Sequence, residues 1–278
     1  MADDYVLGRD LYGSIRLDAQ HLLWKLYTGY LLHPEIPESP TMKIAEIGAG
    51  TGMWLLDLAS QVPQGTQLHG YDLSDEQFPH ESLWPSNTTF NKLDAFGEVP
   101  DHLVEQYDVV HLRMWCCIVK NNDTARLIGH AIRLLKPGGY IQWEDANLGK
   151  PMIRGTTAEE FGRVSSSIFT AVGFHYDWLD NLPEHIRQAD LDIDIDIIHS
   201  ELGEFPPSLV SLSTTTFLAG YVELFRATAG LRLQGLDVPD ESGCRALLMD
   251  VLAAVRKGGA VYHWRPVTLL ARRGATNM

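Results

Sequence analysis

The sequence predicts an α/β fold with a mostly parallel sheet, and a glycine-rich stretch near its beginning is the main reason. Residues 42–47 carry the apolar side chains of a short buried strand. Glycines follow at alternate positions, Gly48, Gly50 and Gly52, and residues 53–59 have apolar side chains at helical spacing. The order strand, glycine turn, helix brings bare backbone and a helix N-terminus against a ligand.

The spacing of the glycines limits which ligand this turn can bind. A dinucleotide site requires Gly-x-Gly-x-x-Gly, but the third position falls on Met53 when counted from Gly48 and on Leu55 when counted from Gly50. A P-loop would need Gly-Lys-Ser or Gly-Lys-Thr, which the stretch lacks. What remains is Glu46 followed by three alternate glycines. A tight turn without a ligand is the other interpretation.

Length and composition are those of a globular protein. At 278 residues, with 45% hydrophobic and 21% charged residues, the chain suits one large α/β domain or a domain with an added cap. The formal net charge of −14 does not suit a nucleic-acid partner, which needs clustered lysine and arginine. No apolar run is long enough for a membrane span, and the acidic start lacks a signal pattern. We therefore expect a cytoplasmic protein, either a monomer or a homodimer, with no membrane or nucleic-acid partner.

Neither the cysteines nor the acidic clusters indicate a metal site. Cys116 and Cys117 are adjacent, and the three cysteines have no Cys-x-x-Cys spacing, so we expect reduced, buried thiols. Residues 191–197 alternate isoleucine or leucine with aspartate. Because like charges on one strand face repel each other, this pattern favours an edge strand with a solvated face, and we predict no bound metal.

A helix is predicted ahead of the glycine stretch, with Ser14 as its candidate N-cap. Prolines between residues 34 and 40 end it near residue 32. The apolar residues that share its expected inward face at helical spacing are Ile15, Ala19, Leu22, Leu23, Leu26 and Tyr30.

Acidic residues follow the next two predicted strands, at the edge where ligands collect in parallel sheets. Asp72, with Leu73 after it, lies about 20 residues beyond the glycine turn, where a carboxylate can bind ribose hydroxyls. Asp72 could instead cap a turn as an Asx residue. Asp94 and Ala95 stand at the end of the strand that follows.

The fourth predicted strand, residues 107–113, is apolar and ends in polar side chains. His111, Arg113 and the following Trp115 deserve attention because of this position alone. His111 could equally be a hydrogen-bonded histidine of the core.

The rest of the chain alternates helices and strands. Lys-Pro-Gly-Gly at 136–139 should end a helix, and Pro266 should begin the last strand because proline cannot donate to a ladder. The aromatic cluster around Phe174 and Tyr176 belongs either to a small second core or to a substrate pocket. Helices are predicted at 123–136, 156–172, 182–189, 207–228 and 240–257, and strands at 66–71, 88–93, 140–143, 191–197 and 266–271.

Residues 14–145, about half of the chain, resemble class I S-adenosylmethionine (SAM)-dependent methyltransferases, most of all the fungal group that modifies secondary metabolites. The motifs that carry the resemblance include A-E-I-G-A-G-T-G-M-W at 45–54, Y-D-L-S at 71–74, Y-D-V-V-H-L-R-M-W at 107–115 and L-L-K-P-G-G-Y-I-Q-W-E-D at 134–145. None of these motifs identifies the substrate.

The resemblance implies a Rossmann-like sheet of seven strands in the order 3-2-1-4-5-7-6, with the last strand antiparallel. It also implies one domain over residues 1–278, with an N-terminal helical lid at 1–40 and helical substrate-cap insertions at 150–180 and 203–258. SAM is the implied cofactor and S-adenosylhomocysteine the implied product. Methyl transfer to an oxygen or nitrogen of a small secondary metabolite is the implied reaction.

The resemblance also suggests roles for individual residues. The expected cofactor-binding residues are Glu46, Gly48, Ala49, Gly50, Gly52, Asp72, Leu73, Asp94, Ala95 and Arg113. The expected substrate-binding residues are Tyr12, Arg16, Trp115, Phe174 and Tyr176, with Gln20 as a further lid contact. His111 and Glu144, at strand ends that would face the cofactor, are the candidate general bases.

Two alternatives stay open at this point. One is a SAM-binding protein that does not methylate, acting as a pathway regulator or reusing the fold for another reaction such as pericyclic ring formation. The other is a protein-modifying methyltransferase, which should show an open acidic groove in place of a closed aromatic cap.

Overall fold

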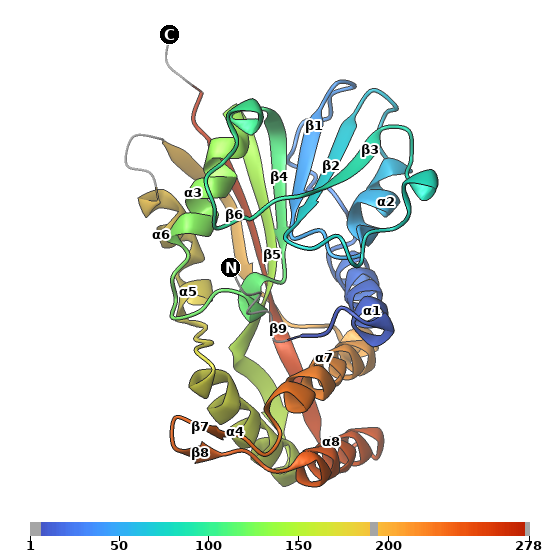
Figure 1. Ribbon diagram of the computed structural model, residues 1–278, viewed down its shortest axis with the longest axis vertical. Helices are drawn as coiled ribbons and strands as arrows, with labels where there is room; N and C mark the ends of the chain where they lie inside the picture. Colours follow the sequence, from blue (N-terminus) through green and yellow to red (C-terminus); the bar gives the residue numbers. More distant parts are fainter. Residues whose placement is uncertain (1–6, 190–193, 276–278) are drawn as a thin grey trace.

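The computed structural model describes residues 7–189 and 194–275 and shows an α/β domain with a long extension at one end (Figure 1). Its central sheet has seven strands in the order β3-β2-β1-β4-β5-β9-β6. Strands β1 to β5 run parallel, and β9 pairs antiparallel with β5 and with β6. Because β9 is the seventh strand of this sheet along the chain, the predicted order is confirmed. The strands are β1 (Lys43–Ile47), β2 (Gln67–Asp72), β3 (Thr88–Lys92), β4 (Tyr107–Arg113), β5 (Leu135–Arg154), β6 (Ile195–Leu202) and β9 (Val261–Arg273).

Helices cover both faces of the sheet. The main helices are α1 (Leu11–Thr28), α2 (Met53–Ala59), α3 (Ala125–Leu134), α4 (Thr156–Ala171), α5 (Asp177–Asp180), α6 (Leu182–Gln188), α7 (Pro207–Thr228) and α8 (Glu241–Arg256). Single turns η1 (Glu81–Leu83), η2 (Asp101–Leu103) and η3 (Trp115–Cys117) and a hairpin of β7 (Arg232–Leu233) and β8 (Leu236–Asp237) complete the chain. Among the described residues, no helix has both the length and the apolarity that crossing a membrane requires.

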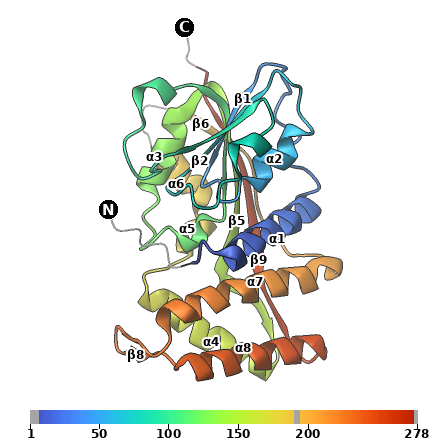
Figure 2. The ribbon, with the colours of Figure 1, turned by 45° about the vertical axis from the view of Figure 1, so that its right-hand side comes forward.

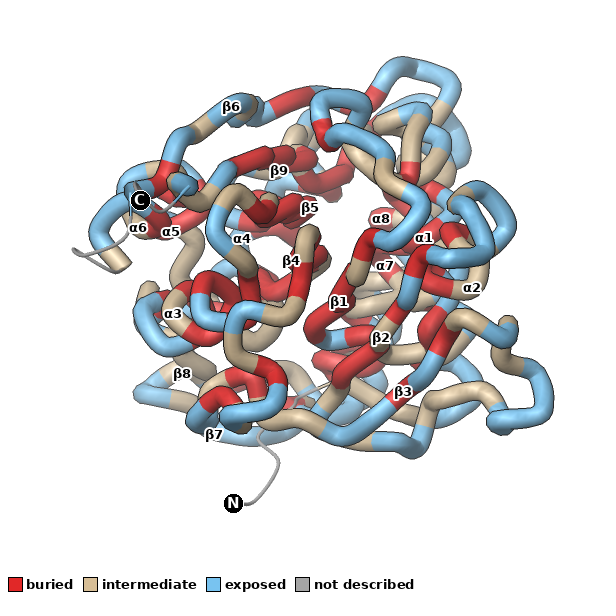
Figure 3. Tube along the Cα trace, turned by 90° about the horizontal axis from the view of Figure 1, so that it is seen from above, coloured by how far each residue is buried: buried red, intermediate tan, exposed pale blue. Residues whose placement is uncertain are grey.

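Successive side chains of a strand point to opposite faces of the sheet, so a hydrophobic core forms on each face. In β1, Ile44 packs with α2 on one face, whereas Ala45 and Ile47 belong to the larger core on the other face. Figure 3 shows that the central strands are buried, whereas the edge strand β6 is largely exposed. Ile195 of β6 is buried and Asp196 is exposed, as an edge strand requires. Part of the predicted 191–197 strand lies outside the described residues.

Strands β5 and β9 extend beyond the rest of the sheet as a two-stranded ribbon (Figure 1). Their pairing runs from Tyr140 opposite Arg272 to Arg154 opposite Val261, with a register shift between Asn147 and Met152. Helices α4, α7 and α8 gather at the far end of this ribbon, and α1 lies across α7 (Figure 2). We call the ribbon and these three helices the cap.

The sequence underestimated the length of β5 and β9. The Lys-Pro-Gly-Gly segment lies within β5 as a bulge, because Leu135 pairs with Tyr107 of β4 and Tyr140 with Val109, and Gly138 has a φ of 80°. Pro266 lies inside β9 and does not begin it. Its carbonyl accepts the N–H of Gly203 just beyond the end of β6, so the missing proline N–H also faces this side. The β5–β9 ladder therefore loses no hydrogen bond at Pro266.

Helix α1 begins earlier than predicted and buries a different face. Asp10, not Ser14, is the N-cap, and its carboxylate accepts the N–H of Gly13 at 2.9 Å. The predicted inward residues Ile15, Leu22 and Leu26 are 55%, 48% and 54% exposed. The side chains that α1 buries are Arg16, Gln20, His21, Leu23 and Trp24. Polar residues can be buried here because neighbouring elements provide charged partners, which periodicity alone does not reveal.

Candidate cofactor and acceptor site

The glycine turn after β1 has the conformation that its glycines allow. Gly48 and Gly52 have φ values of 76° and 70°. A Cβ on Gly48 would lie 3.0 Å from the Trp115 indole, and one on Gly52 would overlap the Phe90 ring. The carbonyl of Tyr71 accepts the N–H groups of Gly48 and of the next residue. The turn therefore follows β1 closely and presents its backbone at the carboxyl end of the sheet.

Asp72 at the end of β2 joins two turns. Its Oδ2 accepts the N–H of Gly50 at 2.9 Å, and its Oδ1 accepts the N–H of Ser74 at 3.1 Å. Burial raises the pKa of this carboxyl, although these hydrogen bonds oppose the shift. The Asx role considered from the sequence is thus present. Each carboxylate oxygen has a second acceptor site, so the same group can also bind hydroxyls.

Asp94 forms a similar turn after β3. Its Oδ1 accepts the N–H of Phe96 at 2.9 Å. Asp94, Ala95 and Phe96 all line the same cavity as Asp72. Phe96 had no sequence signal of its own, because it follows the strand in an otherwise irregular segment.

One cavity of about 640 Å³ connects the strand ends with the cap. The predicted cofactor residues that line it are Gly48, Gly50, Asp72, Leu73, Asp94, Ala95 and Arg113. Glu46, Ala49 and Gly52 are not among its lining residues. Gly52 instead permits α2 to begin close to Phe90, which is a packing role. The residues present fit a ligand of adenosine type, since bare backbone and two carboxylates meet at its wall.

His111 and Glu144 come together, but beneath the cavity. The His111 ring is fully buried and stacks on Trp54 with centroids 3.7 Å apart. Its Nδ1 lies 3.5 Å from Glu46 Oε1 and its Nε2 lies 3.5 Å from Glu144 Oε2. Burial disfavours the charged form of Glu144, yet the contacts with His111, Arg113 and Gln142 together outweigh burial and lower the pKa of this carboxyl. Neither residue lines the cavity, so their role as general bases stays a prediction.

Helix α1 contributes one wall of the cavity through Arg16, Leu17 and Gln20. Arg16 donates through Nε to Glu223 Oε1 of α7 at 2.8 Å, and both side chains are buried. Tyr12, by contrast, is 65% exposed and does not line the cavity. The helix thus lies between the glycine turn and the cap.

A second set of contacts joins α1 to α2 and to the end of β4. His21 Nε2 lies 2.9 Å from Asp57 Oδ2 of α2, and Arg113 Nη1 donates to His21 Nδ1 at 3.3 Å. Burial and the charge of Arg113 lower the pKa of His21. Because arginine only donates, this geometry corresponds to the neutral imidazole with its proton on Nε2.

The cap side of the cavity is mostly apolar and aromatic. Its lining residues include Leu148, Phe169, Thr216, Phe217, Gly220, Tyr221 and Trp264. Of the predicted substrate residues, Trp115 and Arg16 line the cavity, whereas Phe174 and Tyr176 pack outside it. The cavity-lining residues of α7 were not predicted from the sequence, although positions 216, 217, 220 and 221 share one face of a predicted helix. No motif distinguished that face from an ordinary core face.

Comparison with known sequences agrees with this geometry. A family described as a methyltransferase domain matches residues 31–151. The methyltransferase grgD of a Penicillium species is 29% identical over 211 residues, which cover 73% of this chain and 68% of the relative. The N-methyltransferase tcpN of Claviceps purpurea is 35% identical over 136 residues, 48% of each chain. The N-methyltransferase gliN of Aspergillus fumigatus is 25% identical over 277 residues, 95% of each chain.

Solved structures with low sequence identity share the fold. A SAM-dependent methyltransferase of Mesorhizobium loti has a TM-score of 0.51 at 14% identity, covering 92% of this chain and 98% of that one. Phosphoethanolamine N-methyltransferase 2 of Haemonchus contortus, in complex with SAM, has a TM-score of 0.51 at 16% identity. That match covers 92% of this chain and 52% of the larger protein.

Proposed function

We propose that this chain is a class I SAM-dependent methyltransferase of the fungal secondary-metabolite group, and that it methylates a nitrogen or oxygen of a small, largely apolar acceptor. The observation that carries the proposal is the single cavity that joins the strand ends to the aromatic wall of the cap. An acceptor on the cap side would meet a cofactor held at the glycine turn without leaving the cavity.

The cofactor half offers partners for each part of an adenosine ligand. Asp72 and Asp94 both line the cavity, and we expect Asp72 to accept from ribose hydroxyls and the Oδ2 of Asp94 to accept from an exocyclic amino group. The cofactor supplies an activated methyl group on a cationic sulfur. The protein then has to orient the acceptor and exclude water, since an in-line displacement depends mainly on position.

The acceptor half favours a flat, apolar molecule. Phe169, Phe217, Tyr221 and Trp264 give it rigid aromatic walls. His111 and Glu144 do not reach the lining, so the general-base role proposed for them would need a relay through the protein. A neutral amine nitrogen attacks through its own lone pair and releases its proton to solvent only after the new bond forms, so it suits this cavity better than a hydroxyl. Helix α1 is proposed as the lid and the cap as the acceptor wall.

Calorimetric titration with SAM and with S-adenosylhomocysteine tests the cofactor claim. Asp72→Ala should weaken binding about tenfold or more, because two charge-assisted contacts are lost. Asp75→Ala is the matched control, since Asp75 is an exposed neighbour whose carboxylate pairs only at the surface with Lys92. If neither compound binds to the wild-type protein, the proposal is wrong.

Transfer of tritiated methyl from SAM to fungal metabolite fractions tests the reaction itself. Label should enter small, amine-containing compounds, and the label should stay with the compound after extraction from protein. Binding of SAM with no transfer to any fraction, or transfer to protein only, would favour one of the two alternative functions.

A further inference from the structure

Asp145 is a buried carboxylate of β5 whose two oxygens accept four N–H groups. Oδ2 accepts the backbone N–H of Trp115 at 3.0 Å and the indole N–H of Trp143 at 2.9 Å. Oδ1 accepts the N–H of Cys116 at 3.1 Å and that of Ala146 at 2.8 Å. All four acceptor positions of the carboxylate are thereby filled. A group so enclosed holds protein structure and does not bind ligand.

The segment that Asp145 holds is the turn between β4 and α3. Met114 has a φ of 60°, in the left-handed region that side chains other than glycine disfavour. Its N–H donates to the Glu144 carbonyl at 2.9 Å, and the chain then enters the η3 turn at Trp115. Because this backbone is strained, it requires bonds from outside the turn to keep its shape. The two backbone bonds to Asp145 are such bonds.

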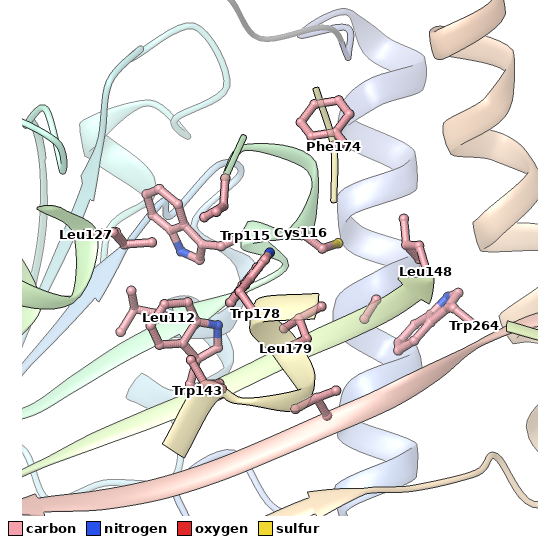
Figure 4. Packing of buried hydrophobic residues seen from close by; sticks show 14 of the residues in the cluster. Leu112, Trp115, Cys116, Leu127, Trp143, Leu148, Phe174, Trp178, Leu179 and Trp264 are labelled. Carbon is pink, nitrogen blue, oxygen red and sulfur yellow. The ribbon is translucent and has the colours of Figure 1, made fainter. Parts of the chain in front are cut away.

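The turn at residues 114–117 forms part of the cavity wall. The Trp115 indole covers Gly48 and donates its N–H to the Ile47 carbonyl at 3.3 Å. Met114 and Cys117 also line the cavity. Figure 4 shows the side chains of Trp115, Cys116 and Trp143 gathered at this point of the core. A shift of the turn would therefore move the cofactor wall and the acceptor wall together.

We propose that Asp145 is a positioning residue for methyl transfer, which sets the Met114–Cys117 turn against the glycine turn. It touches neither ligand and acts through Trp115 and its neighbours. This inference rests on the proposed function, because the wall that it sets is the wall of the proposed SAM site.

The charge of the carboxylate is essential to this role. Burial raises the pKa of Asp145 to about 6, so the group is ionised at neutral pH and protonated in mild acid. The titratable groups that face it are the Cys116 thiol, in hydrogen-bond contact, and the more distant Tyr176 hydroxyl. Burial raises the pKa of both, so neither ionises near pH 6. Protonation of Asp145 replaces one acceptor site by a donor and should loosen the turn.

Asp145→Asn is the decisive variant, because it keeps the shape but turns an amide NH₂ toward two donors. S-adenosylhomocysteine should bind it about tenfold or more weakly than wild type at pH 7.5. At pH 5.5 the ratio of the two dissociation constants should shrink, because the wild-type carboxyl is then largely protonated. Titration of Asp72 is common to both proteins and cancels in this ratio. A purely structural role would lower affinity equally at both pH values.

Two controls separate this effect from lost stability. Trp143→Phe removes one donor of Asp145 but neither bond to the turn. Asp108→Asn removes the charge of a carboxylate at the other end of β4, which accepts the Lys43 N–H and binds Lys136, and so weakens these two contacts. Both should lower the melting temperature yet bind S-adenosylhomocysteine within about twofold of wild type.

The outcomes show whether the proposed SAM site or only the positioning role of Asp145 is wrong. If wild type gives no binding heat, the proposed SAM site fails and the inference fails with it. If wild type binds and Asp145→Asn binds equally well at pH 7.5, only the role of Asp145 is overturned. If Asp145→Asn does not fold, hydrogen exchange in the wild-type protein decides. Slow exchange of the Trp115 and Cys116 amides without ligand supports the held turn, and exchange at the rate of an open loop contradicts it.

Discussion

The two halves of the cavity are built in different ways. The cofactor half consists of backbone and short acids at the ends of β1, β2 and β3, where strand geometry fixes each position. The cap half consists of large side chains on α4, α7 and the β5–β9 ribbon, which lie far from the glycine turn in sequence. A backbone site tolerates few substitutions, whereas a wall of side chains can change its shape one residue at a time. The comparison predicts that the two halves can be disturbed separately.

The largest expected effect comes from the contact that joins the halves. Arg16→Met would leave Glu223 buried without its main charged partner and should lower the free energy of unfolding by about 3–5 kcal/mol. Chemical denaturation measures this loss. Arg16→Met combined with Glu223→Gln should regain most of it. A double variant as unstable as the single one would show that packing, and not charge, dominates at this contact.

The backbone half should lose its ligand when side chains are added to it. Gly48→Val forces a left-handed φ on a branched residue and presses against Trp115, which should weaken S-adenosylhomocysteine binding about 30-fold or more. Gly258→Val shares the left-handed conformation but has open space around it. The Gly258 variant should lose stability and keep its affinity, as thermal melting and calorimetry can establish.

The cap half should show the opposite pattern. Phe217→Leu removes one aromatic wall and its stacking on Tyr262, whose ring centroid lies 5.1 Å away. The KM for an acceptor found in the labelling screen should rise roughly three- to tenfold. The dissociation constant of S-adenosylhomocysteine should change less than about twofold. Equal losses for both ligands would contradict the separation of the halves.

The smallest effect concerns the attachment of α1 to the cofactor side. The folded-state pKa of His21 is lowered, so between that value and about 6.5 the unfolded chain binds the additional proton. This histidine therefore contributes stability at neutral pH that is lost as the pH falls below about 6.5. His21→Gln should show a shallower fall in melting temperature between pH 7.5 and 5.5 than wild type. Parallel curves for the two proteins would place the pH dependence in other groups.

The contrast between the halves also explains what the sequence could predict. Gly48, Asp72 and Asp94 line the cavity, and their place at the strand ends could be predicted because strand geometry puts fixed residue types and spacings at this edge of the sheet. Phe217 and Trp264 were not, because an apolar residue facing a cavity has the same pattern as one facing a core. The sheet order followed from the family resemblance, whereas the length of the β5–β9 ribbon had no counterpart in any motif.

Helix α1 shows a further limit of periodicity. Its apolar stripe through Ile15, Leu22 and Leu26 faces outward, and its polar side is buried against Glu223 and Asp57. Ion pairs and hydrogen bonds to elements distant in sequence allow a helix to bury its polar face, and only the tertiary fold brings those partners together. For the same reason His111 could not be assigned from its strand position. The partners that surround it come from β1, α2 and β5.

The β5–β9 ribbon makes the cap an exchangeable module. Chain enters the cap after Asn147, at the register shift, and returns near Pro266, where β6 has already ended. A crossover between relatives at these two points would exchange the acceptor chamber together with α5, α6 and β6, which lie between them in sequence, and would leave the predicted cofactor residues unchanged. In evolution, the same two points would let one methyl-donor platform acquire new acceptors by recombination.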